Sequence, residues 1–231
     1  MLRSWPGMPT RSIPKSHRSV TGRIASAKLG RPAEFESTLE RDLLTLLEFD
    51  SQVLGYEEQP VTIGYTAPDG SSRSYTPDVL VAYRGSLVRR DPKRIELVEV
   101  KYRTDLFADW PRLKPKLRAG RAYSRERGWR FRILTEHEIR TPYLQNARFL
   151  LGYRALAVDR CDVETVTNAL RRRPEVRIDQ LLESISTDRW RRAELIPVLW
   201  HLVAAGALET DLGVPLTMHT VVRIGSEGEI E

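Results

Sequence analysis

The chain has 231 residues, of which 41% are hydrophobic and 29% charged, and its formal net charge is +6. This length suits one large domain or two small ones, each able to bury a core. No apolar run approaches the roughly 18 residues of a membrane span, no apolar signal core opens the chain, and the single cysteine excludes an internal disulfide. A protein of the reducing cytoplasm is therefore expected.

Positive charge is concentrated in two stretches. No acidic residue precedes Glu34, whereas lysines and arginines recur before it, and residues 103–132 are strongly basic. Blocks of this kind favour a polyanion such as DNA through counterion release. An ordinary solvated basic surface would explain the charge equally well.

The first elements are an arm and a helix. Residues 1–33 are rich in Ser, Pro, Gly and Arg with little periodicity, which predicts a flexible basic arm. A helix is predicted over 37–49, because its leucines follow the 3.6-residue period. Ser37 and Glu40 match the N-cap and N3 positions of a capping box.

The middle of the chain predicts an α/β domain over residues 34–157. Three strands joined by short links indicate an antiparallel meander, and a crossover through a basic helix closed by Gly128 leads to a fourth strand. The result is a mixed sheet with helices on its faces. The predicted elements are strand 61–65, turn 67–70, strand 75–83, polar loop 84–93, strand 94–102, helix 110–127, strand 130–134 and helix 137–152.

The composition shifts near residue 158, and the remaining residues, 158–231, predict an α+β winged-helix domain. Its third helix is mostly apolar, which favours a core or protein-binding role over reading DNA bases. The predicted elements are helices 163–172, 178–186 and 191–205, followed by a wing over 208–213 and 217–224.

Two short segments carry the chemistry, Thr76-Pro77-Asp78 and Glu99-Val100-Lys101. Residues i and i+2 of a strand share a face, so Glu99 and Lys101 project together. Carboxylates and a backbone carbonyl, here that of Val100, are hard ligands that suit Mg²⁺, with Mn²⁺ as an alternative. A bound cation would activate water for phosphodiester cleavage, and Lys101 would orient that water or stabilise negative charge. A surface Glu–Lys pair is the simpler alternative.

Two further groups are candidates. Glu40 has a complete structural role in the capping box, but it also lies at the edge of the buried leucine stripe, so its sequence alone leaves both roles open. The basic residues after the active strand would contact DNA phosphates if Arg121 or Arg125 faces the acids; otherwise they form a solvated helix face. The candidate DNA contacts are Arg103, Lys114, Lys116, Arg118, Arg121 and Arg125.

These segments together resemble the TnsA family, the endonuclease subunit of Tn7-like heteromeric transposases. The resemblance covers most of the chain, in the family's order. The segments that carry it are Ser19-Val20-Thr21-Gly22-Arg23, Glu36 to Asp42 leading to Leu47-Glu48-Phe49-Asp50, Gln59-Pro60, Tyr75-Thr76-Pro77-Asp78 and Val98-Glu99-Val100-Lys101.

The resemblance implies a restriction-endonuclease-like PD-(D/E)xK core followed by a winged helix. It implies that Glu40 completes a metal site with Asp78 and Glu99, and that Lys101 is the catalytic lysine. Some family members carry Gln where this chain has Glu99. The implied activity is Mg²⁺-dependent cleavage of the non-transferred strand at the 5′ ends of a mobile element, in the bacterial cytoplasm.

The implied partners are double-stranded transposon ends, a DDE transposase that cuts the 3′ ends, and an AAA+ ATPase regulator that docks on the C-terminal domain. Two other hypotheses stay open. In the first, the chain is a stand-alone nuclease of the same fold that acts in restriction or repair. In the second, it is a non-catalytic adaptor that binds DNA and recruits a partner. DNA cleavage by the chain alone would indicate a stand-alone nuclease, cleavage only with partners a transposase subunit, and no cleavage an adaptor.

Overall fold

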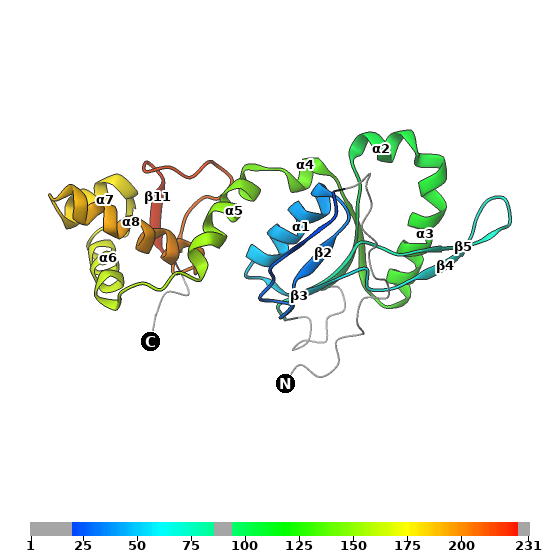
Figure 1. Ribbon diagram of the computed structural model, residues 1–231, viewed down its shortest axis with the longest axis horizontal. Coiled ribbons are helices and arrows are strands. Elements are labelled where there is room, and N and C mark those ends of the chain that lie inside the picture. Colours follow the sequence, from blue (N-terminus) through cyan, green and yellow to red (C-terminus); the bar gives the residue numbers. More distant parts are fainter. Residues whose placement is uncertain (1–19, 86–93, 226–231) are drawn as a thin grey trace. The chain divides into compact units, whose positions relative to one another are not determined.

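The computed structural model describes residues 20–85 and 94–225, which fall into two compact units divided between Arg140 and Thr141 (Figure 1). Within these residues, no helix is both long enough and apolar enough to cross a membrane. The N-terminal unit contains β1 (Gly22–Ile24), β2 (Ala33–Phe35), α1 (Thr38–Phe49), β3 (Val53–Glu58), β4 (Ile63–Thr66), β5 (Ser72–Tyr75), β6 (Val79–Tyr83), β7 (Ile95–Val100), α2 (Arg103–Ala108), α3 (Trp110–Glu126), β8 (Arg130–Leu134) and α4 (Glu136–Ile139).

The central sheet has the strand order β3-β6-β7-β8. β6 pairs antiparallel with both β3 and β7, while β7 pairs parallel with β8. A parallel pair needs a crossover connection, and α2 and α3 supply it. The predicted mixed sheet and its crossover are therefore confirmed.

The predicted meander is wrong, because its second strand is broken. The expected strand 75–83 is divided into β5 and β6, and β5 pairs with β4 in a separate hairpin. Pro77 lies in the break and lacks the N–H that a continuous ladder would need. The neighbour of β6 is instead β3, which sequence analysis did not predict because it ends in two buried acids, Glu57 and Glu58.

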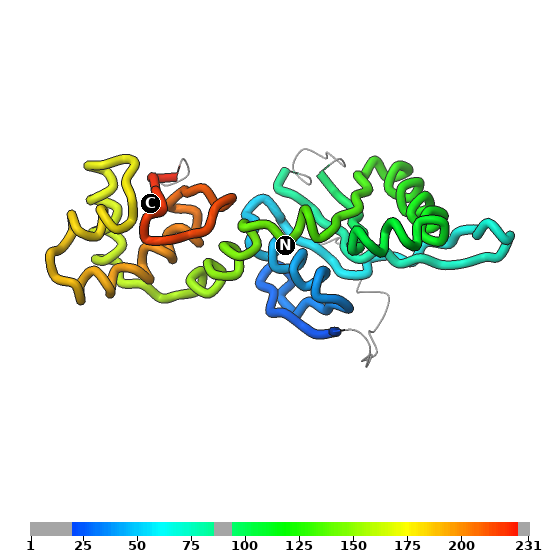
Figure 2. Tube along the Cα trace, turned by 90° about the horizontal axis from the view of Figure 1, so that it is seen from above, coloured from blue at the N-terminus to red at the C-terminus, as the bar shows by residue number. Residues whose placement is uncertain are grey.

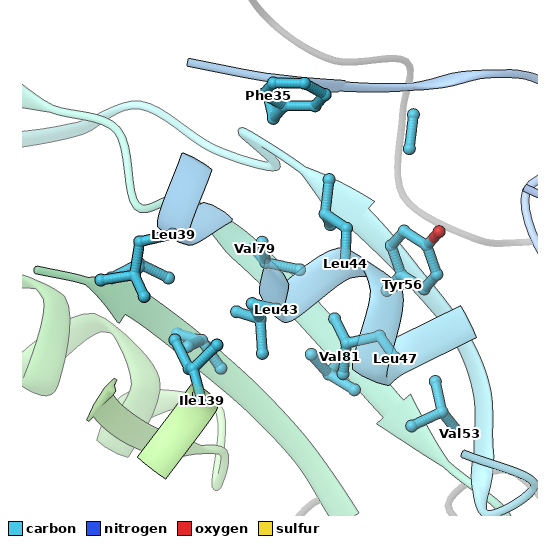
Figure 3. Close-up of a cluster of buried hydrophobic side chains, with 13 residues drawn as sticks. Phe35, Leu39, Leu43, Leu44, Leu47, Val53, Tyr56, Val79, Val81 and Ile139 are labelled. Carbon is cyan, nitrogen blue, oxygen red and sulfur yellow. The ribbon is translucent and has the colours of Figure 1, made fainter. Parts of the chain in front are cut away.

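Helices cover both faces of the sheet. The leucines of α1 pack on the face formed by alternate residues of β6 and β7, including Val79, Val81 and Val98 (Figure 3). The opposite face carries Leu80 and Leu97 and packs under α3. Glu99 shares the Leu97 face because strand residues alternate. The β4–β5 hairpin contacts α3, and its turn projects past that helix (Figure 2).

Helix boundaries follow local signals. The predicted helix 37–49 is confirmed as α1, with Ser37 as its N-cap. α3 ends at Glu126, and Gly128 follows in the left-handed region at φ 71°. The predicted helix 137–152 is two helices, because Pro142 starts α5 and disfavours a helical conformation in the residue before it. α2 was not predicted.

The expected flexible arm differs from the structure where it is described. Within residues 20–33, β1 leads to a turn and then to β2, its antiparallel partner. This segment is tied to α1, because the Ser26 hydroxyl donates to Glu48 Oε2 at 2.7 Å and Lys28 Nζ donates to Leu47 O at 2.7 Å. Residues 1–19 of the expected arm, and residues 86–93 of the expected polar loop, lie outside the described residues.

The C-terminal unit is a helical bundle with a small sheet of order β10-β11-β9. α5 packs against α8, with the rings of Phe149 and Trp200 5.2 Å apart, so this unit begins at Thr141 and not at residue 158 as expected. Its elements are α5 (Pro142–Arg154), α6 (Arg160–Arg172), β9 (Glu175–Arg177), α7 (Ile178–Ile185), α8 (Arg189–Ala204), β10 (Leu208–Glu209) and β11 (Val221–Ile224).

The apolar residues of α8 form the core of the C-terminal unit. Leu195 and Leu199 are fully buried, and Trp200 is almost so. Of the two roles that sequence analysis left open for this helix, the structure selects the core role. The apolar stripe of α8 is therefore not an exposed docking surface.

Candidate active site

Asp78 is held between two strands at the point where β6 begins. Its Oδ2 accepts a hydrogen bond from the backbone N–H of Val100 at 2.6 Å, and its carbonyl oxygen accepts one from the N–H of Gln59 at 2.8 Å. Gln59 adopts a positive φ of 48°, an uncommon conformation for a side-chain-bearing residue. Both the backbone and the carboxyl of Asp78 are thus fixed before any ligand binds.

Glu99 is the most enclosed acid of the site, with 1% of its side chain exposed. Its Oε2 accepts a hydrogen bond from the Tyr75 hydroxyl at 2.7 Å. Its Oε1 lies 3.2 Å from Lys101 Nζ and 2.9 Å from Lys116 Nζ. A buried carboxylate needs such partners to offset the loss of water, and here both oxygens have them.

Lys101 follows β7 and points back toward the acids. Its Nζ donates to the carbonyl of Val100 at 3.0 Å. Burial alone would lower the pKa of this ammonium, but the carboxylates of Asp78, Glu99 and Glu40 outweigh burial and raise the pKa above its ordinary value. Lys101 therefore stays protonated and serves as a fixed positive charge.

Glu40 sits in the first turn of α1, where its carboxylate accepts hydrogen bonds from the Glu36 N–H at 2.8 Å and from the Ser37 hydroxyl at 2.9 Å. The Ser37 oxygen in turn accepts from the Glu40 N–H at 3.1 Å. The capping box is therefore modified, because Glu40 reaches the N–H of Glu36 and not that of Ser37. Gln59 Nε2 donates to Glu36 Oε1 at 3.0 Å, which ties this corner to β3.

Two acids of the site, Asp78 and Glu40, have raised pKa values. The pKa of Asp78 lies well above its ordinary value, mainly because the carboxyl is removed from water and then because Glu99 and Glu40 are negative. Burial likewise raises the pKa of Glu40, against the opposing influence of its hydrogen bonds and of Lys101. The charges of Glu99, Lys101 and Glu40 all act on Asp78, which places the four groups in one electrostatic cluster. Perturbed carboxyls that share a cluster are typical of catalytic sites.

The donor atoms suit a hard divalent cation, although they do not form a ready cage. Within residues 20–85 and 94–225, no group of three or more His, Cys, Asp or Glu side chains is arranged to hold a metal ion. Glu40 is engaged by its own helix end, and ammonium groups contact Glu99 Oε1. Carboxylate oxygens and the Val100 carbonyl are nevertheless the ligand types that Mg²⁺ prefers. The chemistry of the donor set therefore fits a magnesium ion.

The predicted DNA contacts on α3 separate into two groups. Lys114, Arg118, Arg121 and Arg125 are all exposed and follow the spacing i, i+4, i+7 and i+11. At about 100° per residue this spacing puts them on one face of the helix, which we call the basic stripe, about 16 Å long. Sequence analysis required Arg121 or Arg125 to face the acids, but Lys116 contacts them instead.

The remaining candidates lie outside this cluster. Arg103 begins α2, is exposed, and places its guanidinium 5.5 Å from the centre of the Phe107 ring. Glu58, a buried acid at the end of β3, pairs with Arg31 through both of its oxygens. It belongs to the anchor of the N-terminal segment and not to the site.

Sequence analysis missed the contacts that Tyr75 and Lys116 make with Glu99. Tyr75 was quoted only as part of a motif, and the hydroxyl partner of Glu99 follows from the β4–β5 hairpin, which was not expected to be separate. Lys116 was one of several basic residues on a helix. Only its spacing of three and four residues from Leu113 and Gly120 on the buried face of α3 would have singled it out.

Two family models match the chain in succession. Residues 50–136 match the model described as TnsA-like endonuclease N terminal, and residues 138–212 match the model described as TnsA endonuclease C terminal. The two matches meet at residue 137, three residues before Arg140, the last residue of the N-terminal unit. No curated protein matches the chain. Asp78, Glu99, Lys101 and Lys116 fall within the first matched region, and Glu40 precedes it.

Proposed function

The chain belongs to the TnsA endonuclease family, and from this premise we propose that it is the DNA-cleaving subunit of a Tn7-like transposase. The observation that carries the proposal is the meeting of two carboxyls and a lysine at one end of β6 and β7. Asp78 is bonded to the N–H of Val100, the residue between Glu99 and Lys101. This arrangement supports a restriction-endonuclease-like PD-(D/E)xK core.

We propose that Asp78, Glu99 and the carbonyl of Val100 hold a magnesium ion, with Glu40 completing the site. A bound Mg²⁺ ion would lower the pKa of water and offset charge on the phosphate. The protein's own groups do the rest. Lys101, kept protonated by three acids, orients water or stabilises the leaving oxygen, and Asp78 is held rigidly by its backbone partners.

DNA would bind across α2 and α3. The basic stripe lies on the side of α3 away from the acids, so its four cations would contact phosphates away from the scissile bond, and Arg103 would add a fifth cation at the start of α2. Arginine and lysine on one helix face contact phosphates without reading bases, which fits a subunit whose target choice is made by partners. The expected substrate is the 5′ end of the element on the non-transferred strand.

The C-terminal unit is proposed to be a winged helix. Its order of three helices with β9 between the first two, followed by the β10–β11 pair, supports this assignment. We propose that it docks an AAA+ regulator, while a DDE transposase cuts the other strand. Because the apolar stripe of α8 from Leu195 onward is mostly buried, docking would use other exposed surface of this unit, such as the start of α8, where Trp190 is 67% exposed.

Strand cleavage on a labelled element end tests the proposal. Wild-type protein and Asp78→Ala are each incubated with Mg²⁺, with and without the cognate transposase. Cuts at the 5′ ends by wild type with its partner, and none by Asp78→Ala, are expected. Cutting by wild type alone would favour a stand-alone nuclease. Equal assembly of both proteins with no cutting by either would make the core an adaptor.

A further inference from the structure

Lys116 is the one predicted DNA contact on α3 that touches the acids. Its Nζ lies 2.9 Å from Glu99 Oε1 and 4.8 Å from the centre of the Tyr75 ring, and 22% of its side chain is exposed. At about 100° per residue, Lys116 lies about 160° around the helix axis from Lys114 and hence from the basic stripe. Lys116 therefore has a different environment from its basic neighbours.

Tyr75, Glu99 and Lys116 form a closed set of contacts that involves three elements. The Tyr75 hydroxyl holds Glu99 Oε2, and the Tyr75 ring supports the ammonium that holds Oε1. The hydroxyl bond orients Glu99, and Oε1 is the oxygen that both ammonium groups approach. Lys101 shares that oxygen at 3.2 Å, but its Nζ has a second partner in the Val100 carbonyl.

The ammonium groups around Glu99 oppose the binding of a divalent cation there. Three acids (Glu40, Asp78 and Glu99) face two ammonium groups (Lys101 and Lys116), so the cluster without a metal ion is close to neutral. A divalent cation at Glu99 would have to approach an ammonium within a few ångströms. Unit charges 4 Å apart repel strongly even in water, and more so in a partly buried site.

We propose that Lys116 is an exchangeable cation: it occupies Glu99 Oε1 in the metal-free protein and leaves it for a DNA phosphate when metal binds. This inference rests on the proposed function. Each ligand then favours the other, because DNA draws the ammonium away from the metal position and metal releases the ammonium to DNA. Metal and DNA binding are thereby coupled, and coupling of this kind is reciprocal.

Such coupling would keep the nuclease site poorly loaded with metal until DNA is present. Lys116 acts here as a positioning residue, through Glu99 and the phosphate. Its aliphatic stem and its aromatic support leave room for the ammonium to move without repacking α3, since lysine has a flexible four-carbon stem.

The test is Mn²⁺ binding followed by the electron paramagnetic resonance signal of the free ion, with and without a short DNA duplex. The variants are Lys116→Met, Lys116→Arg, and Lys114→Met as the matched control that removes one exposed charge from the same helix. Samples are checked on a gel so that only uncut DNA is scored. Circular dichroism establishes that each variant is folded, and Lys116→Gln, which also removes the charge, serves if Lys116→Met is not.

Without DNA, Lys116→Met is expected to bind Mn²⁺ about thirtyfold more tightly than wild type, the factor for one unit charge 4 Å from a divalent ion in water. Lys114→Met and Lys116→Arg should stay near the wild-type affinity. DNA should tighten Mn²⁺ binding in wild type and in Lys114→Met, but clearly less in Lys116→Met.

Unchanged or weaker Mn²⁺ binding by Lys116→Met without DNA would overturn the proposal, because Lys116 would then only hold Glu99 in place. Equal coupling to DNA in Lys116→Met and wild type would overturn the exchange with phosphate. Wild-type protein that binds neither Mn²⁺ nor DNA would instead contradict the proposed function. The two failures are thus distinguishable.

Discussion

Asp78 accepts a hydrogen bond from the backbone N–H of Val100 at 2.6 Å, which ties the start of β6 to the residue between Glu99 and Lys101. This bond holds Asp78 beside Glu99, although the negative charge of Glu99 disfavours ionisation of Asp78. Burial and the neighbouring acids raise the pKa of Asp78. The site therefore stores unfavourable free energy at neutral pH, which a ligand can relieve.

Replacing Asp78 with Asn should stabilise the metal-free protein at neutral pH. Asn keeps an oxygen that accepts from Val100 but carries no charge. A raised folded pKa makes the wild-type carboxyl's contribution fully present below its unfolded pKa and lost as pH rises through the folded pKa. The advantage of Asp78→Asn in free energy of unfolding should therefore be small near pH 4 and grow toward pH 7, measured by urea unfolding in chelator.

Asp69 supplies the control for that experiment. The hydrogen bonds from Ser71 lower the pKa of Asp69 in the exposed β4–β5 turn. The contribution of the Asp69 carboxyl to the free energy of unfolding has the opposite sign: it is present above the unfolded pKa and is lost as pH falls through the folded pKa. Asp69→Asn should therefore give no stabilisation at neutral pH. An equal loss of stability in both variants at pH 7 would show that Asp78 is not held at a cost.

Tyr75→Phe should weaken both the fold and the site. The substitution keeps the ring beside Lys116 but removes the hydroxyl that donates to Glu99 Oε2. Leaving a buried charged acceptor short of a partner costs about 1–3 kcal/mol. Urea unfolding in chelator should show this loss, and cleavage at saturating DNA should fall because Glu99 is no longer fixed.

Tyr65→Phe is the matched substitution on the neighbouring strand β4, where the side chain is only half buried. It should leave the free energy of unfolding within about 0.5 kcal/mol of wild type. If Tyr75→Phe and Tyr65→Phe behave alike in both assays, the hydroxyl of Tyr75 has no special role at Glu99.

The residues of the catalytic end were predictable because strand periodicity fixes them. Glu99 and Lys101 share a face at a spacing of two, and Pro77 marks the break before Asp78. Sequence analysis left Glu40 open as a cap or a site acid; in the structure it caps α1, and Lys101 is near enough to lower its pKa, so the cap lies beside the candidate site.

The support of the site was not predictable from local pattern. β3 carries two buried acids whose partners lie elsewhere in the chain, such as Arg31 for Glu58. Likewise, the anchoring of residues 20–33 depends on Glu48, a residue that looks like an exposed helix acid until Ser26 and Tyr56 bond to it. Long-range polar partners leave no periodic signal, and these segments were therefore misassigned.

The basic stripe should contribute to DNA affinity in a salt-dependent way. Arg118→Ala and Arg121→Ala each remove one phosphate contact, so the slope of log K against log salt should become shallower by about 0.9 for each. Fluorescence anisotropy with a labelled duplex over a range of salt measures the slope. Arg130→Ala is the control, because Arg130 lies on β8 beside Glu96 and outside the stripe.

A slope unchanged by Arg118→Ala and Arg121→Ala would place the DNA on another surface. A combined variant should shift the slope by the sum of the two changes, because separate phosphate contacts release counterions independently. Relative affinities for different duplex sequences should stay the same, since phosphate contacts carry no base information.

Replacing Gly120 of α3 with Ala has two opposing effects on the free energy of unfolding. In an exposed helix, Gly→Ala stabilises by about 1 kcal/mol through backbone entropy. At Gly120, however, a Cβ would meet Phe131 Cε2 at 2.8 Å and Tyr75 Cε1 at 3.0 Å, so these two rings or the helix must shift. Overpacking of this kind costs about 1–3 kcal/mol, and it therefore outweighs the gain.

Gly120→Ala should lower the free energy of unfolding and reduce cleavage, because α3 carries Lys116 and a shift of the helix withdraws it from Glu99. Gly152→Ala in α5 is the control: no neighbouring atom lies within 4 Å of its added Cβ, so it should stabilise by about 0.5–1 kcal/mol. Urea unfolding of the two variants gives the sign of each change. Stabilisation by both substitutions would mean that α3 is not closely packed on β5 and β8, and the contact between Lys116 and Glu99 would lose its support.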